Sequence, residues 1–374
     1  MNPPKLNEFE DIFTDEIEEL DNAFVIPREK DLPNAPSQES GVLTAEGEFV
    51  SNCINYRVKG QFNYAPELPN SSDLQELSGA WMYAGPMFGH FGHFLMDSMT
   101  RFWAWDELKD KIDGILFVPK QNNDGQLRVL GIQTPLIEAM GITAEARVVE
   151  YPTRVEKLFV PTMGIGLGEW MMGSPAFQKH VLKYGGGDIE PHGPEKIYIS
   201  RFDLPKGRSS YVGEGRVQSY LEKAGYTTIH PQKLSKVEQV QRYKAATHVI
   251  APDGSALHLL AYCGRDDQKV SIISRRSNQP GLIFAEQINK FRGSDVVTHN
   301  HLVDDWLPHP NRGPNRLSWG QVSLSELSRA LLERDMISGV DPLEDLAENE
   351  VADEIAAIEK MEEKKFISFK SLNN

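Results

Sequence analysis

Two histidines and an aspartate, His90, His93 and Asp97, stand close together in an aromatic stretch of the chain. On a helix, His93 and Asp97 would share one face and touch, because residues four apart are neighbours there. Three kinds of site use these residue types: a carboxylate base with a histidine helper, a buried structural pair, and a metal centre. Because no HExxH motif or carboxylate cluster accompanies the histidines, we rank the base first, the structural pair second and the metal last.

A second group of charged residues follows a strand expected at 196–201. Arg201, Lys206, Arg208 and Glu214 occupy one loop and the start of a helix, in a chain whose formal net charge is −15. Basic residues clustered in an acidic protein are typical of an anion site. The alternative is a solvated loop whose charges bind nothing.

A glycine turn joins an expected strand to an expected helix in the segment PDGSALH. Gly254 would let a ligand approach the backbone, and the amides of Ser255 and Ala256 would open the helix, whose N-terminus favours phosphate. The segment matches neither GxGxxG nor GxxxxGK[ST], so the signal is weak. The alternative is a plain turn that Asp253 or Ser255 caps.

The elements that position these residues alternate between strand and helix, which predicts an α/β fold with a mainly parallel sheet. Four strand–helix units in the second half favour a Rossmann-like domain there, and Ser235 with Glu238 forms a capping-box pattern. The expected strands lie at 80–85, 114–119, 146–152, 155–162, 196–201, 227–231, 248–251 and 269–275, and the expected helices begin near Gly89 and cover 127–142, 213–226, 234–247 and the residues after Gly254.

Changes in composition along the chain predict its domain organisation. Glycines and prolines gather at 164–195, where we expect the connection between two domains. We therefore expect an acidic, proline-containing arm over 1–50, an acceptor-side Rossmann-like domain over 51–185, a nucleotide-binding Rossmann-like domain over 186–300, and a loop and helical tail over 301–374 that packs across the domains.

The overall composition excludes several protein classes. The chain has 374 residues, of which 40% are hydrophobic and 25% charged, as in water-soluble globular proteins. We see no apolar run long enough for a membrane span and no signal peptide. Two cysteines fit a reducing cytosol, so we expect a cytoplasmic protein. The acidic balance argues against a nucleic-acid partner, and the oligomeric state, a homodimer included, stays open.

Three blocks of sequence, in this order and at this spacing, resemble glycosyltransferase family 61, which includes DUF563-type bacterial members. The first is GHFLMDSMTRF, the second is YISR followed by Arg208 and Glu214, and the third is LSKVEQVQRYKAATHVIAPDGSALHLL. The resemblance covers about residues 80–275. It implies two Rossmann-like domains facing a cleft, the GT-B architecture, and an inverting transfer of sugar from a nucleotide-sugar donor to a glycan or glycoconjugate acceptor, in surface or capsular polysaccharide assembly.

The resemblance also assigns roles to individual residues. Asp97 would be the base for the acceptor hydroxyl, and His93 would orient it. Arg201 and Arg208 would neutralise the departing diphosphate, and Glu214 would hold an arginine or the donor. The remaining matches are Glu238 and Gln239, near the nucleotide, and Gly254, Ala256 and Leu257, in the turn after the strand.

One position departs from the family pattern. Many members have histidine where this chain has Asp253, and a carboxylate near a diphosphate is repulsive unless it binds the sugar, a basic residue or a metal. No DxD motif lies between strands, because GRDDQ at 264–268 follows an expected helix, so we predict metal-independent transfer without a cofactor. The alternatives are a non-catalytic nucleotide- or polyanion-binding protein and a nucleotide- or NAD-dependent enzyme; the missing GxGxxG argues against the last.

Overall fold

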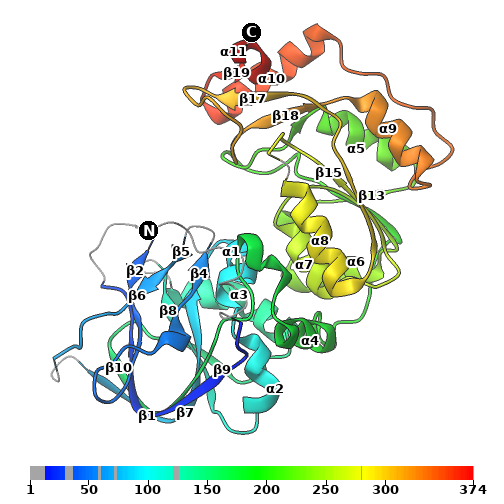
Figure 1. The fold of residues 1–374 in the computed structure, drawn as a ribbon. Helices are drawn as coiled ribbons and strands as arrows, with labels where there is room; N and C mark the ends of the chain where they lie inside the picture. Colours follow the sequence, from blue (N-terminus) through cyan, green and yellow to red (C-terminus); the bar gives the residue numbers. More distant parts are fainter. Residues whose placement is uncertain are drawn as a thin grey trace. The chain divides into compact units, whose positions relative to one another are not determined.

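The computed structural model describes residues 13–29, 37–57, 60–70, 74–120, 126–278 and 280–373. The chain forms two compact units, Met1–Asp188 and Ile189–Asn374 (Figure 1). Each unit has its own sheet and its own hydrophobic core.

The main sheet of unit 1 has six strands in the order β3-β1-β10-β7-β8-β9. The four strands from β10 to β9 pair in parallel, whereas β1 and β3 add antiparallel strands at one side. Their side chains supply a core of valine, leucine and aromatic residues. The strands are β1 (Ile17–Ile26), β3 (Gly41–Leu43), β7 (Gln75–Met87), β8 (Gly114–Pro119), β9 (Glu145–Val148) and β10 (Thr153–Pro161).

The order of the parallel strands in unit 1 creates a topological switch point. The chain runs from β7 to β8 to β9 in one direction and then crosses to β10 on the other side of β7. In open parallel sheets, ligands bind outside the carboxyl ends of the strands at such a point. The carboxyl ends of β7 and β10, at Met87 and Pro161, therefore mark where a ligand of unit 1 is expected.

The N-terminal segment corrects one expectation from the sequence. We expected an arm over residues 1–50, but Ile17–Ile26 is a strand that pairs along β10 and β3. Its last four residues are buried. Three of the acidic residues that suggested an arm, Glu18, Glu19 and Asp21, lie in the first half of the strand, where their side chains are partly or fully exposed. Residues 1–12 and 30–36 lie outside the described residues.

The helical segment after β7 is irregular. It begins as α1 (Phe91–His93), continues as a π-helical turn (Phe94–Ser98) and ends as α2 (Trp105–Leu108). Such π-helical turns occur frequently at functional sites. The other elements of unit 1 are α3 (Gln126–Ala139), α4 (Pro175–Tyr184), the 3-10 turns Ser51–Cys53, Phe102–Ala104 and Gly168–Met172, and the short strands β2 (Gln38–Glu39), β4 (Tyr56–Arg57), β5 (Gly60–Gln61) and β6 (Asn63–Tyr64).

The main sheet of unit 2 has five strands in the order β13-β11-β14-β15-β16, all parallel. The first strand along the chain, β11, thus lies between the second and third, so the switch point falls between β11 and β14. This mixed α/β arrangement confirms the α/β class that the sequence predicted. The strands are β11 (Lys196–Ile199), β13 (Thr227–Ile229), β14 (His248–Pro252), β15 (Lys269–Ile273) and β16 (Asp295–His299).

Helices cover both faces of this sheet. Apolar residues of α5 (Glu214–Lys223) and α9 (Leu324–Glu333) form one core with β11, β14 and β15, while α7 (Ala256–Cys263) and α8 (Pro280–Arg292) lie side by side on the other face (Figure 1). The helix α6 (Lys236–Ala245) begins at the predicted capping box, in which Ser235 and Glu238 satisfy each other's backbone N–H groups.

The C-terminal segment also differs from the sequence-based expectation. We expected a loop and helical tail over 301–374, but this segment contains strands as well as helices and belongs to unit 2. A four-stranded sheet runs in the order β12-β18-β17-β19, against which α10 packs. These elements are β12 (Tyr211–Val212), β17 (Leu302–Pro308), β18 (Trp319–Val322), β19 (Phe366–Ser368), α10 (Glu348–Glu362) and α11 (Phe369–Asn373), with a 3-10 turn at Pro231–Lys233.

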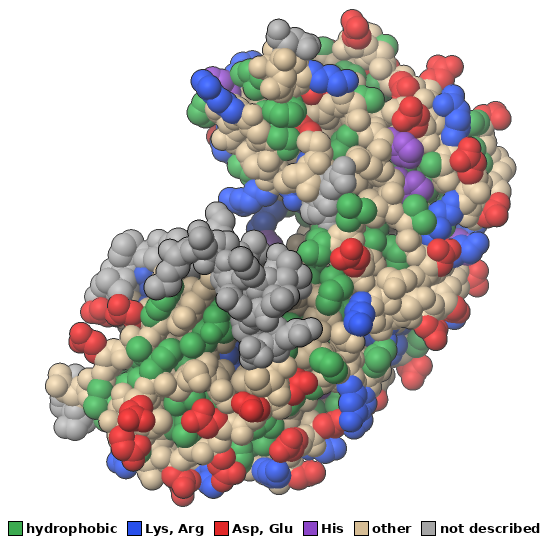
Figure 2. Space-filling view, in the orientation of Figure 1, with side chains coloured by type: hydrophobic (Ala, Val, Ile, Leu, Met, Phe, Trp, Pro, Cys, Tyr) green, Lys and Arg blue, Asp and Glu red, His purple; other side chains and the backbone are tan. Residues whose placement is uncertain are grey.

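The surface and the cysteines complete the description. Acidic and basic side chains are interspersed on the face that Figure 2 shows. Among the described residues, no helix is both long and apolar enough to cross a membrane. Cys53 and Cys263 are free and buried, and burial raises the pKa of their thiols to about 11 and about 12.

Candidate functional site

The histidine and aspartate that the sequence singled out form a hydrogen-bonded pair in unit 1. His93 Nδ1 lies 2.8 Å from Asp97 Oδ2, and Arg57 Nε lies 3.2 Å from Asp97 Oδ1. Arg57 also approaches His93 Nδ1, at 3.0 Å. Because Nδ1 carries at most one hydrogen and the carboxylate is the stronger acceptor, we assign that hydrogen to the bond with Asp97. Both carboxylate oxygens are therefore occupied.

The end of β7 holds the π-helical turn that carries Asp97. Ser98 Oγ donates to the Pro86 carbonyl at 2.7 Å and accepts from the Phe88 amide at 2.9 Å. Asn55 donates to the backbone carbonyl of Asp97 at 2.9 Å. These bonds fix the pair beside the carboxyl end of β7, one side of the switch point in unit 1.

Arg101, four residues after Asp97, is fully buried and fastens two segments to this turn. Its Nε donates to the Pro161 carbonyl at 2.7 Å, at the end of β10. Its Nη2 donates to the carbonyls of Asn52 and Ile54 at 2.9 and 3.0 Å. The planar fork of donors in arginine suits this multiple bonding, and lysine could not reproduce it. Arg101 is a structural residue of the site that spacing alone did not reveal.

Accessibility distinguishes the two members of the pair. The Asp97 side chain is 2% exposed, whereas 38% of the His93 side chain is exposed. The solvent-facing imidazole, oriented by the buried carboxylate, is thus the member that a substrate can reach. Among the described residues, no three histidine, cysteine or carboxylate side chains gather as a metal site would require. Metal-independent chemistry remains a prediction.

In unit 2, Arg201 and Glu214 meet at the carboxyl end of β11. The Arg201 amide donates to Glu214 Oε1 at 2.7 Å, and the Tyr198 hydroxyl donates to the same oxygen at 2.9 Å. Burial, and then the Glu214 carboxylate, raise the pKa of Tyr198 well above its ordinary value, so the phenol stays a donor. Glu214 opens α5, where a negative charge is favoured by the helix dipole.

The guanidinium of Arg201 lies against Gly254, at the carboxyl end of β14. A Cβ at position 254 would be 2.7 Å from Arg201 Nη1, so glycine is required for this approach. Burial, and then the guanidinium of Arg275, lower the pKa of Arg201 to about 9. An anion bound here would offset that cost. The Leu257 and His258 amides at the start of α7 already donate to the Gly254 and Ser255 carbonyls, at 3.0 and 3.2 Å, so the amides that α7 offers to a ligand are those of Ser255 and Ala256.

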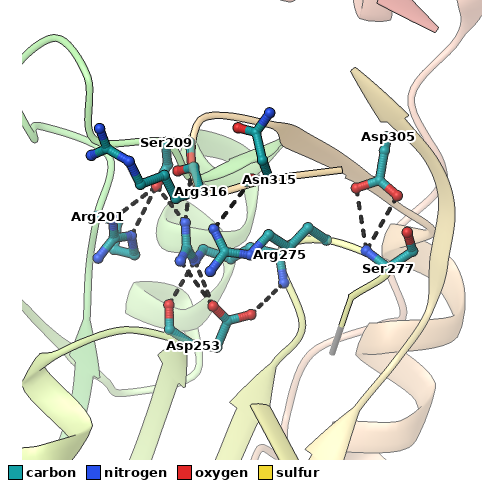
Figure 3. Close-up of polar contacts among 9 residues, drawn as sticks. Arg201, Ser209, Asp253, Arg275, Ser277, Asp305, Asn315 and Arg316 are labelled. Carbon is teal, nitrogen blue, oxygen red and sulfur yellow. Dashed lines mark hydrogen bonds and ion pairs between the residues drawn. The ribbon is translucent and has the colours of Figure 1, made fainter. Parts of the chain in front are cut away.

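Two guanidiniums converge on the backbone carbonyl of Ser209 (Figure 3). Arg201 donates to it from Nε and Nη2 at 3.0 and 2.9 Å, and Arg275 donates from Nη1 at 2.7 Å. Arg275 Nη2 also forms an ion pair with Asp253 Oδ1 at 2.9 Å, and its amide donates to Asp253 Oδ2 at 2.9 Å. The carboxylate that departs from the family pattern therefore binds a basic residue.

Sequence reasoning missed Arg275 and Arg276, which follow β15. The Nε of Arg276 is buried and has no hydrogen-bond partner among the described residues, and its Nη1 makes one long contact, 3.4 Å to the Asn315 carbonyl. Two arginines directly after a buried strand, beside the switch point of a parallel sheet, are the signal that identifies them. Asp305 lies nearby and accepts from the Ser277 amide at 3.2 Å.

Four other predicted residues lie outside this cluster or have structural partners. Lys206 forms an ion pair with Glu363 after α10, and Arg208 is exposed. The Glu238 carboxylate accepts from the Ser235 amide in the capping box. Gln239 donates to the carbonyls of Pro231 and Leu234. The structure brings together Arg201, Glu214, Asp253 and Gly254, with Ser255 and Ala256 at the start of α7.

We expect the Gly254→Ala variant to bind an anionic ligand about tenfold more weakly, because the new methyl group displaces the Arg201 guanidinium and removes one charge-assisted hydrogen bond. The measurement is a titration with a nucleoside diphosphate, and Gly131→Ala is the matched control, since a Cβ there meets no atom within 4 Å. Unchanged affinity in Gly254→Ala would remove Arg201 from the anion site.

Part of the chain matches a known protein family. The family model described as Glycosyltransferase 61 matches residues 91–270, a range that contains His93, Asp97, Arg201 and Asp253 but ends before Arg275. No curated protein matches the chain. The matched region, residues 91–270, belongs to glycosyltransferase family 61.

Proposed function

We propose that the chain is an inverting glycosyltransferase that moves a sugar from a nucleotide-sugar donor to a carbohydrate or glycoconjugate acceptor, in the assembly of a surface polysaccharide. The observation that carries the proposal is the group of three arginines, Arg201, Arg275 and Arg276, at the carboxyl ends of β11 and β15, in which Arg276 Nε has no hydrogen-bond partner within the described residues. The GT-B arrangement, with the donor on one Rossmann-like domain and the acceptor on the other, is part of the same proposal.

The donor diphosphate is proposed to bind in unit 2. Asp253 already pairs with Arg275, so the donors that remain are Arg201 Nη1 and the Nε and Nη2 of Arg276, which make no hydrogen bond within the described ranges. Charge-assisted bonds from guanidinium to phosphate are short and strong. The opening amides of α7 add donors without adding charge. Together they stabilise the negative charge that develops on the leaving diphosphate.

The acceptor hydroxyl is proposed to meet His93 in unit 1. Its exposed Nε2 takes the proton, while Nδ1–H donates to Asp97, which stabilises the imidazolium that forms. This reverses the roles expected from the sequence, because both oxygens of the buried Asp97 are occupied by Arg57 and His93. Inversion follows if the acceptor oxygen attacks the anomeric carbon from the side opposite to the diphosphate. One C–O bond then forms as the other breaks, and the electron pair leaves with the phosphate oxygen.

The first experiment is a thermal-shift titration of the full chain with UDP, GDP, CDP and the corresponding nucleotide sugars, with Mg²⁺ or with EDTA. At a ligand concentration of one hundred times Kd, mass action stabilises the native state by about 2.7 kcal/mol. We expect one nucleotide series to raise the melting temperature equally with Mg²⁺ and with EDTA. A shift that EDTA abolishes would contradict metal independence, and the absence of a shift with every nucleotide would contradict the donor site.

We expect Arg201→Ala and Arg276→Ala each to lower the affinity for that nucleotide diphosphate by about 10- to 100-fold, since each removes a charge-assisted bond. Arg329→Ala is the matched control, because Arg329 is exposed on α9 of the same unit. Binding of the nucleoside, without phosphates, should change little in either variant. Equal losses for the nucleoside and the diphosphate would show that the arginines support the fold rather than the phosphates.

A further inference from the structure

A cavity of about 220 Å³ opens in unit 1 beside the carboxyl end of β10. Its lining comes from Thr162 and Met163, which follow the last residue of β10, from Thr14 and Glu16, which precede β1, and from the 51–56 segment. The cavity therefore lies at the carboxyl end of β10, one of the two strands that flank the switch point of unit 1. The volume suits one small ring, because pockets for larger ligands occupy roughly 300–1,000 Å³.

The lining of the cavity is polar but not basic. Uncharged hydrogen-bonding side chains and one aromatic ring predominate, and the only charged lining residue that the structure describes is a carboxylate. Such a lining excludes a phosphate or carboxylate ligand, and it offers several donors and acceptors to a ligand rich in hydroxyl groups. The side chains concerned are Thr14, Glu16, Ser51, Asn52, Tyr56 and Thr162.

One polar atom of this lining is left without a protein partner. Thr162 is only 8% exposed. Its Oγ1 is buried and makes no hydrogen bond within the described residues. Buried hydroxyls are nearly always hydrogen-bonded, so an unsatisfied one on a residue that lines a cavity points to a missing partner such as water or a ligand. Tyr56, braced edge-on by Trp170 at a ring separation of 5.8 Å, presents an aromatic surface beside it.

Two of the three segments that line the cavity are fastened to the helical turn that carries the proposed base. Arg101 binds the carbonyl of Pro161, next to Thr162, and the carbonyls of Asn52 and Ile54. Arg57, next to Tyr56, binds Asp97. Adjacent residues of a strand point to opposite faces, so the ring of Tyr56 and the guanidinium of Arg57 lie on different sides of β4. The cavity is thus a neighbour of the base and not the place where the proton moves.

We propose that this cavity is a subsite for a neutral sugar residue of the acceptor glycan, adjacent to the residue that receives the transferred sugar. The inference rests on the proposed function, since it names the acceptor class of the same enzyme. Arg101 acts here as a positioning residue that holds the subsite at a fixed place relative to His93.

The test uses the full chain without any nucleotide, so that it does not depend on the donor site. The probes are the methyl glycosides of glucose, galactose, mannose and xylose, observed by saturation-transfer difference NMR. We expect at least one glycoside to bind the wild type, Thr162→Val to weaken it about fivefold through the lost hydroxyl, and Ser51→Trp to abolish the signal by filling the cavity.

Thr143→Trp is the matched control, because Thr143 is exposed before β9 and does not line the cavity. Its signal should equal that of the wild type. The proposal is overturned if no glycoside binds the wild type, or if Ser51→Trp keeps the wild-type signal. In transfer assays, Ser51→Trp should raise the acceptor KM while the nucleotide thermal shift stays unchanged. If no nucleotide shifts the melting temperature of the wild type, the donor site is contradicted and the sugar subsite is not.

Discussion

The His93→Ala variant is expected to transfer sugar about 10²- to 10⁴-fold more slowly than the wild type, the range that loss of a general base typically produces. The imidazole is half-exposed and only its Nδ1 is engaged with Asp97, so its removal should leave the fold intact. Nucleotide affinity, measured by thermal shift, should not change, because the proposed donor residues lie in unit 2. The rate is measured as transfer to a saturating acceptor.

A matched control and a chemical rescue make this prediction specific. His192→Ala removes an exposed imidazole elsewhere in the chain and should transfer at the wild-type rate. Added imidazole should restore part of the activity of His93→Ala, because it replaces the missing base. If formate rescues Asp97→Ala while imidazole fails with His93→Ala, the carboxylate is the base, as the sequence pattern suggested. Full activity in both variants would remove the pair from catalysis.

Strand and cap positions could be predicted from the sequence because their signals are local. The apolar run at 114–119 is β8, and the Ser235–Glu238 spacing gives the observed capping box. The four-residue spacing of His93 and Asp97 predicted their contact even though the helix is irregular there, since both α- and π-helical turns keep these residues on one side. Local pattern therefore sufficed where the physical interaction was itself local.

Contacts between distant segments could not be predicted in this way. Arg57 reaches Asp97 from a two-residue strand 40 positions earlier in the chain, and no periodicity identifies it. Arg275 pairs with Asp253 only because β14 and β15 are neighbours in the sheet. The partners depend on strand order, which the apolar pattern alone does not determine. The same reason explains why β1 was mistaken for part of an arm.

The departure at position 253 shows what strand order contributes. From the sequence, a carboxylate at this turn conflicts with a bound diphosphate. In the structure, that charge is held by the guanidinium and the amide of Arg275, and the carboxylate is 0% exposed. Asp253 therefore need not face the donor at all, and it no longer argues for a binding protein without catalytic activity.

Replacing Asp253 by Asn is expected to lower the free energy of unfolding of unit 2 by about 3 kcal/mol, because removal of one partner leaves the buried Arg275 uncompensated. For a unit of this size, the loss corresponds to a fall of roughly 6–12 °C in melting temperature. Urea unfolding measures it. Asp267→Asn is the matched control: its ion pair with Arg265 is exposed, so its loss should cost at most about 1 kcal/mol.

The double variant Asp253→Asn, Arg275→Met tests whether the effect belongs to the pair. Buried ion pairs are often replaced by uncharged groups at little cost, so we expect the double variant to be more stable than Asp253→Asn alone. Donor affinity should nevertheless fall in the double variant, because a methionine at position 275 no longer shares the Ser209 carbonyl with Arg201. The single variant Arg275→Met completes the comparison. If its loss of stability and that of Asp253→Asn simply add in the double variant, Asp253 and Arg275 are independent. In that case a histidine at position 253, which many family members carry, would be tolerated beside Arg275. If the two residues are coupled, a histidine at position 253 would require a substitution of Arg275 as well.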